Sequence, residues 1–441
     1  MAGRRIILRG GTLLCLDGRR TIRRTDVLVD DGVIAAIGGV DAPGAEVVQV
    51  SGLVMPGLVQ AHLQLDLSLQ GPGFVAASDP AVRRRQDAAW RGGMDEHGAR
   101  ISAQAGLSAA LSAGAITVAD PSSVRFGPSA LAAARAVGSR LVLFVDAAKK
   151  DAFEALVVAR EGVAADGADP TVSLALWGGA AERTPRGRLR AAARLAAQEG
   201  VPLVVTLGAA PGLGRGLERL ERAGALGPQT VLVHAHGASL ATPRARARVK
   251  AAGAAVVVTP SHEILTGAPP APVAELLAEA IPVGLGSVGG AARLGMDLFA
   301  EARLAARLLR GKVAAPASLA LEMAARFGAD GLKVPTGVLE VGRRADLIVL
   351  ALEPDPQDDH EAVAAKVLDS GGPELLRALY VQGVPRLGEH GSRRAPAPDV
   401  VAEVRGRLVE ATRPAAGRAS WTEVVRAPLR QGRGWHRLPW G

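Results

Sequence analysis

The sequence predicts a (β/α)₈ barrel joined to a small β-sandwich that both ends of the chain build. Eight short apolar runs alternate with Ala-, Arg- and Glu-rich stretches of helical periodicity. Most runs are apolar at nearly every position, as strands buried on both faces must be. A doubly wound open sheet is the weaker alternative, because no Gly-rich phosphate loop follows the first run. The expected barrel strands are 54–62, 115–120, 140–147, 172–178, 202–208, 230–236, 254–260 and 281–287.

The segments flanking these runs have the character of short antiparallel strands. Residues 1–55 contain apolar or alternating runs broken by Gly and Asp, with a hairpin-turn signal at Asp30-Asp31-Gly32. Strand character returns at 337–353 and 379–387. We therefore expect a composite sandwich from 1–55 and 331–387, and a barrel domain over 56–330.

Residues 388–441 are rich in Arg, Pro and Gly and are interpreted as a basic C-terminal tail. The tail holds three of the five tryptophans, Trp421, Trp435 and Trp440, which are costly to leave in water. We expect part of it to dock on the body or on another subunit.

Composition excludes several classes of protein. The net charge is +9, but residues 401–441 carry eight arginines against three acidic residues and so supply +5 of it. With 3% aromatic residues and no basic stripe in the body, a nucleic-acid partner is not expected. One cysteine, Cys15, rules out a disulfide framework. No apolar run suits a membrane span or a signal peptide, so a cytoplasmic protein without a membrane partner is expected.

Polar side chains stand at the expected carboxyl ends of the barrel strands, where barrel enzymes place their working residues. An Asp there is more often a helix cap, and a His in an apolar strand is more often a core residue. We take His62 and His236 as candidate catalytic residues. The pattern does not decide whether His236 or His234 faces the cavity, since both lie on one face of the strand. Candidate ligand-binding residues are Gln64, Asp66, Asp120, Asp146, Thr206, His262, Glu263 and Ser287.

The segment VMPGLVQAHLQLD resembles the opening of the barrel in the amidohydrolase superfamily, in its chlorohydrolase and cytosine/guanine deaminase-like branch. The resemblance continues through DVLVDDGVIAAIG, AGAITVAD, LVHAHGASL, VVVTPSHEIL, VGLGSVGGAARLGMDLFAEARLA and GVLEVGRRADLIVL, and so covers nearly the whole chain. It implies a barrel that hydrolyses non-peptide C–N bonds, using one divalent metal held by four protein ligands.

This sequence departs from the implied metal site. The first two ligands, a His-x-His pair, fall on His62 and Gln64. The third falls on Thr206 and the fourth, an Asp, on Val288. The His-x-x-Glu glutamate falls on Ala209, and the Arg of an Arg-Gly pair on Gln70. Only the histidine of the sixth strand is kept, as His236. Gln, Thr and Val are poor or impossible ligands for zinc or iron, so no metal and no other cofactor is expected.

Three hypotheses of function follow from these departures. The first is a metal-independent enzyme that acts on a small nitrogenous compound by histidine acid/base chemistry. The second is an inactive pseudoenzyme, a binding or regulatory subunit. The third is a true metal hydrolase with a relocated site built from His62, His236 and Asp120 or Asp146. A small-molecule ligand is expected in each case, with assembly as a homo-oligomer or as a hetero-oligomer with a paralogue.

Overall fold

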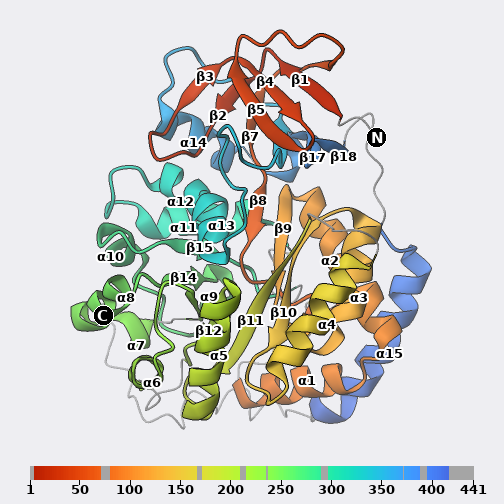
Figure 1. The fold of residues 1–441 in the computed structure, drawn as a ribbon, viewed down its shortest axis with the longest axis vertical. Coiled ribbons are helices and arrows are strands. Elements are labelled where there is room, and N and C mark those ends of the chain that lie inside the picture. The colour runs from red at the N-terminus through yellow and green to blue at the C-terminus, as the bar shows by residue number, and fades with distance from the viewer. Residues whose placement is uncertain are drawn as a thin grey trace, which may run out of the picture.

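A closed barrel of eight parallel strands forms the body of the protein (Figure 1). The computed structural model describes residues 4–70, 80–165, 171–208, 215–234, 237–289, 296–370, 372–387 and 395–416. The barrel expected from the sequence is confirmed, and its strands follow chain order. They are β8 (Leu58–Gln60), β9 (Ala115–Asp120), β10 (Arg140–Asp146), β11 (Val172–Ala180), β12 (Leu203–Thr206), β13 (Thr230–Val233), β14 (Ala255–Val258) and β15 (Val283–Leu285).

The barrel closes between its first and last strands just beyond β8 and β15. Ala61 N–H donates to the Leu285 carbonyl at 2.9 Å, and Leu63 forms a parallel bridge with Val288. Gly286 permits this close approach, because a Cβ there would lie 2.8 Å from the Cβ of His62. The closure therefore brings the residues after β8 and β15 into direct contact.

The first apolar run of the sequence, expected to form one barrel strand over 54–62, is divided between two sheets. Its first half, β7 (Leu53–Pro56), pairs with β16 (Leu347–Leu350) outside the barrel, and its second half is β8. Gly57 lies between them, where a Cβ would come within 2.2 Å of the Ile116 side chain. Glycine allows the chain to pass tightly from one sheet to the other.

Two further sheets lie above the barrel in Figure 1. One contains β5 (Val33–Gly38), β4 (Asp26–Asp30), β1 (Arg5–Arg9) and β6 (Glu46–Gln49). The other contains β18 (Val384–Leu387), β17 (Leu376–Val381), β16, β7, β2 (Thr12–Leu14) and β3 (Ile22–Arg24). The two ends of the chain pair here as expected, through β7 and β16, and β4 and β5 pair across the turn predicted at 30–32. The domain boundaries drawn from the sequence stay a prediction.

Helices cover the outside of the barrel. They are α1 (Pro80–Gly92), α2 (Glu96–Ser112), α3 (Ser123–Val137), α4 (Ala152–Ala164), α5 (Arg186–Glu199), α6 (Gly216–Ala223), α7 (Gly237–Leu240), α8 (Pro243–Ala252), α9 (Pro260–Thr266), α10 (Val273–Ala278), α11 (Leu298–Leu309), α12 (Pro316–Ala324) and α13 (Arg326–Leu332). The 3₁₀ turn η1 (Leu65–Leu67) follows β8. Beyond the barrel come α14 (His360–Asp369) and the 3₁₀ turn η3 (Pro373–Leu375). None of the helices in the described part of the chain is both long and apolar enough to span a bilayer.

Part of the segment interpreted as a tail is a long helix, α15 (Pro398–Ala416), which packs against α1 and α2 beside the barrel (Figure 1). Its Val404 and Leu408 are buried in a cluster with Trp90 and Met94. Arg407 forms a two-point ion pair with Asp95, both contacts at 2.8 Å. The Arg- and Pro-rich sequence of this segment does not predict a helix. Trp421, Trp435 and Trp440 lie outside the described residues.

Candidate functional site

The rings of Trp177 and His234 flank the buried side chain of His62 at the carboxyl end of the barrel. The His62 carbonyl accepts the backbone N–H groups of Ser287 and Val288, at 3.2 and 3.1 Å, which fixes the residue against the last strand. The His62 ring stacks on Trp177 of β11, with centroids 6.3 Å apart, and meets the edge of His234 at 4.7 Å. His234 in turn lies 5.5 Å from His262 of α9.

The ring of His62 is buried and makes no hydrogen bond to any residue in the described part of the chain. It is 1% exposed, and neither of its nitrogens has a hydrogen-bond partner among the described residues. Burial, helped by the nearby His262, lowers the pKa of His62 from 6.5 to about 3. The imidazole is therefore neutral at neutral pH and offers one N–H donor and one acceptor nitrogen.

Of the two histidines that end the sixth strand, His234 is the one seen beside His62. It follows β13 with a φ of 52°, a conformation few non-glycine residues adopt. His236, the expected catalytic partner, lies outside the described residues. The described part of the site therefore contains His234, one of the two histidines between which the sequence does not decide.

A second polar group forms next to His62, around Gln64 and Asp66. Arg91, near the end of α1, donates Nε to Asp66 Oδ2 at 2.6 Å and Nη2 to Gln64 Oε1. Trp90 of the same helix donates its indole N–H to the Asp66 carbonyl at 2.8 Å. Gln64 and Asp66 are thus held by α1. Neither Trp90 nor Arg91 could be picked out from the sequence, because α1 carries no recognisable motif.

Asp120, at the end of β9, holds the 3₁₀ turn in place. Its Oδ1 accepts the backbone N–H groups of Leu65 and Ser122 and the Ser122 hydroxyl, at 3.1, 2.9 and 2.5 Å. Its Oδ2 has no partner among the described residues, and neither has Oδ1 of Asp66. Both residues line a cavity of about 10 Å³. Burial raises the pKa of Asp120 to about 7.

The remaining candidates from the sequence have contacts within the protein. Glu263 accepts the backbone N–H groups of Thr259 and Ala271, so its carboxylate braces the loop around α9. Asp146 accepts the N–H of Ala148 at 3.0 Å, as a loop cap does. The hydroxyl of Ser287 accepts from Gln60 at 2.9 Å, and that of Thr206 donates to the Gly179 carbonyl at 3.4 Å. Their roles in ligand binding stay predictions.

Comparison with known proteins assigns the family. The sequence profile of the Amidohydrolase family matches residues 53–375, well over half of the chain. The chain belongs to the amidohydrolase family. A 5-methylthioadenosine/S-adenosylhomocysteine deaminase of Halobacterium salinarum is 32% identical in an alignment that covers 80% of this chain and 86% of the relative. The corresponding deaminase of Haloarcula marismortui is 30% identical over 79% of this chain and 84% of its own length.

Solved structures agree in fold with this amidohydrolase. An adenosine deaminase from Xanthomonas campestris with bound zinc superposes with a TM-score of 0.78 at 20% identity, covering 92% of this chain and 98% of its own. Atrazine chlorohydrolase from Arthrobacter aurescens, complexed with zinc, gives 0.74 at 23% identity, covering 91% and 100%. The deaminase and chlorohydrolase resemblance drawn from the sequence is thereby confirmed at the level of family and fold.

At the positions where the sequence resemblance places the four metal ligands, three of the four described side chains do not suit a metal. Oε1 of Gln64 accepts from Arg91, and the side chain of Val288 is aliphatic. The hydroxyl of Thr206 is directed to a backbone carbonyl. Within the described ranges, no three His, Cys, Asp or Glu side chains are grouped so that they could share a metal ion. Of the four described residues at the implied ligand positions, only His62 has a side chain that commonly binds zinc or iron.

Proposed function

We propose that this amidohydrolase takes a small amino-substituted heterocycle at the carboxyl end of the barrel and acts on a non-peptide C–N bond without the four-ligand metal centre. The buried ring of His62, whose nitrogens have no hydrogen-bond partner among the described residues, carries the proposal. Leaving a buried polar group without a hydrogen bond costs about 1–3 kcal/mol, so such groups call for an explanation. A ligand that hydrogen-bonds to His62 supplies one.

The neighbours of His62 suit a flat nitrogenous ligand. Trp177 provides an aromatic face, and the rings of His234 and His262 add further imidazole nitrogens near His62. The neutral His62 ring can donate one hydrogen bond and accept another, but its pKa of about 3 makes it a weak general base at neutral pH and leaves almost no protonated ring to act as an acid. We therefore assign His62 a hydrogen-bonding role that orients the heterocycle and leave proton transfer to a second group, such as His236.

The names of the relatives support the amino-heterocycle class. Both are deaminases of 5-methylthioadenosine and S-adenosylhomocysteine, compounds that carry an aminopurine. Deamination of an adenine-like ring is accordingly the first reaction to assay.

The test combines turnover with metal content. The protein, purified without chelator, is incubated with 5-methylthioadenosine, and ammonium release is followed while bound metal is measured by plasma mass spectrometry. We expect release with far less than one metal per chain, and its loss in His62→Asn. His97→Asn, at an exposed position of α2, is the matched control and should keep the activity. Turnover that requires stoichiometric metal would contradict the proposal and favour the relocated-site hydrolase.

A second candidate is a binding or regulatory subunit without turnover. Val288 favours it, because an aliphatic side chain stands where the family's aspartate, the proton acceptor, is implied. Calorimetric binding of 5-methylthioadenosine that depends on His62 but yields no ammonium would support this candidate over the first. Assembly with further copies or with a paralogue stays a prediction.

A further inference from the structure

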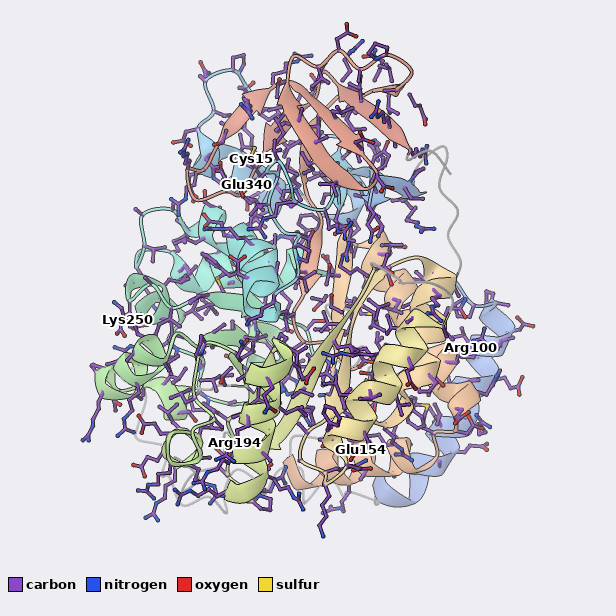
Figure 2. The ribbon with its side chains drawn as sticks, viewed as in Figure 1. Cys15, Arg100, Glu154, Arg194, Lys250 and Glu340 are labelled. Atoms are coloured by element: carbon purple, nitrogen blue, oxygen red, sulfur yellow. The ribbon has the colours of Figure 1, made fainter. Side chains whose placement is uncertain are left out.

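A hollow of about 460 Å³ opens at the end of the barrel opposite to His62. One wall is the loop after β2, with Gly18, Arg19 and Arg20. The other comes from the barrel and includes residues 280–282, which precede β15, together with α12 and α13. Figure 2 labels Cys15, which lies shortly before this loop in the sequence, beside Glu340, where the upper sheets meet the barrel. The hollow thus lies between the sandwich sheets and the amino-terminal end of the strands, apart from the candidate active site.

The polar side of the hollow has more positive than negative groups. Glu322 is the one carboxylate among the described residues that line it, and both of its oxygens are engaged: Oε1 accepts Nε of Arg20 at 3.0 Å, and Oε2 accepts Nη2 of Arg326. Nε of Arg326 is buried and has no acceptor among the described residues. Arg19 adds a third guanidinium at the exposed rim. The exposed part of the Arg326 guanidinium, whose side chain is 22% exposed, and the guanidinium of Arg19 are therefore available to an anion.

The opposite side of the hollow is apolar. Leu277, Ile281, Pro282, Leu319 and Phe327 line it. The guanidinium carbon of Arg326 lies 4.6 Å above the ring centre of Phe327, which joins the two sides. An occupant that matches both sides has an anionic head and a flat or short apolar body.

We propose that this hollow binds a small organic anion, a carboxylate or a phosphate monoester attached to a ring or a short hydrocarbon. The head accepts from the exposed part of the Arg326 guanidinium and from Arg19, whose planar forks suit either kind of oxyanion. The body covers Phe327 and its apolar neighbours. Because Arg19 and Arg20 belong to the sandwich and Arg326 to the barrel, the bound anion links the two parts and stabilises the folded chain. This site goes beyond the proposed function and shares no residue with it.

Calorimetry and thermal unfolding of the full chain test the proposal with four probes: phenyl phosphate, benzoate, inorganic phosphate and the uncharged benzyl alcohol. We expect phenyl phosphate and benzoate to bind at one site per chain and to raise the unfolding temperature. Inorganic phosphate should bind about tenfold more weakly, since it lacks the apolar body, and benzyl alcohol should show no saturable binding.

Two variants and a control locate the binding. Arg19→Ser removes the rim charge, and Arg326→Lys keeps a cation for Glu322 while removing the planar guanidinium. Each should weaken phenyl phosphate binding by about fivefold or more. Arg194→Ser, on α5 at the far end of the molecule in Figure 2, makes the same charge change and should have no effect. Absence of saturable binding, wild-type affinity in Arg19→Ser and Arg326→Lys, or a loss that follows Arg194→Ser would overturn the proposal. Since no turnover is measured, the result is independent of the reaction proposed above.

Discussion

At the scale of single residues, the burial of His62 gives the protein a defined pH dependence. The pKa of this ring is about 3 in the folded chain and 6.5 as an ordinary value. Between these values the unfolded chain binds one proton more than the folded chain. The free energy of unfolding is therefore highest above pH 6.5 and falls as the pH drops towards 3. We expect wild type to lose about 2 kcal/mol relative to His62→Asn between pH 7 and pH 5, measured by urea unfolding.

Other buried groups do not disturb this comparison. Burial raises the pKa of Asp120 and of Glu301 to about 7, so the stability linked to them falls as the pH rises through the same range. Both residues are present in wild type and variant, and their effect cancels in the difference between the two proteins. Parallel pH profiles for wild type and His62→Asn would show that the His62 ring is hydrated and not buried as described.

The sequence located the carboxyl ends of the strands but not what each polar residue does there. His62 could be chosen because an apolar strand leads directly to it. Glu263 was chosen by the same reasoning. Its carboxylate instead accepts the backbone N–H groups of Thr259 and Ala271 and so braces a loop. The contacts of Gln64 depend on Arg91, which lies on a helix 27 positions later and follows no periodic pattern. Such contacts arise from packing, which one sequence does not reveal.

At the scale of elements, α15 shows how composition conceals a docked helix. Arginine and proline make residues 388–441 resemble a solvated tail, but Val404 and Leu408 are four positions apart and therefore lie on one face of the helix. That face packs on Trp90, which is 0% exposed, while Arg407 reaches Asp95 at the surface. Burial of a few apolar side chains outweighs a composition typical of disorder.

This arrangement predicts unequal roles for the two kinds of contact in α15. Leu408→Ala should lower the free energy of unfolding by about 2–4 kcal/mol, because it leaves a cavity against Trp90. Arg407→Ala is the matched control on the neighbouring position. Its side chain is 50% exposed, so the loss should stay below about 1 kcal/mol. Urea unfolding followed by circular dichroism measures both, and an equal loss in the two variants would mean that the ion pair anchors the helix.

At the scale of the whole molecule, the repeated pattern of buried strands was sufficient to predict the barrel. A strand buried on both faces is apolar throughout, and that signal occurs eight times. The contact that joins barrel and sandwich carries no such signal. Arg140 begins β10 and Asp346 precedes β16, 206 positions later, and their side chains are 1% and 0% exposed. A pair so distant in sequence becomes visible only when the fold has brought it together.

The Arg140–Asp346 pair gives the last prediction, on how the two parts of the molecule are held together. Asp346 accepts Nε and Nη2 of Arg140 at 2.9 and 3.3 Å, and its Oδ1 also accepts the backbone N–H of Gln382. Asp346→Asn leaves a buried guanidinium without a counter-charge, which should cost about 3–5 kcal/mol.

The double variant Arg140→Met, Asp346→Asn removes both charges and keeps a side chain that can accept from Gln382. It should therefore recover much of that loss, since the cost arises from the unpaired charge more than from the absent pair. Urea unfolding of wild type, both single variants and the double variant gives the coupling energy. If the double variant is destabilised by the sum of the two single changes, the charges do not interact, and other contacts must hold the barrel against the sandwich.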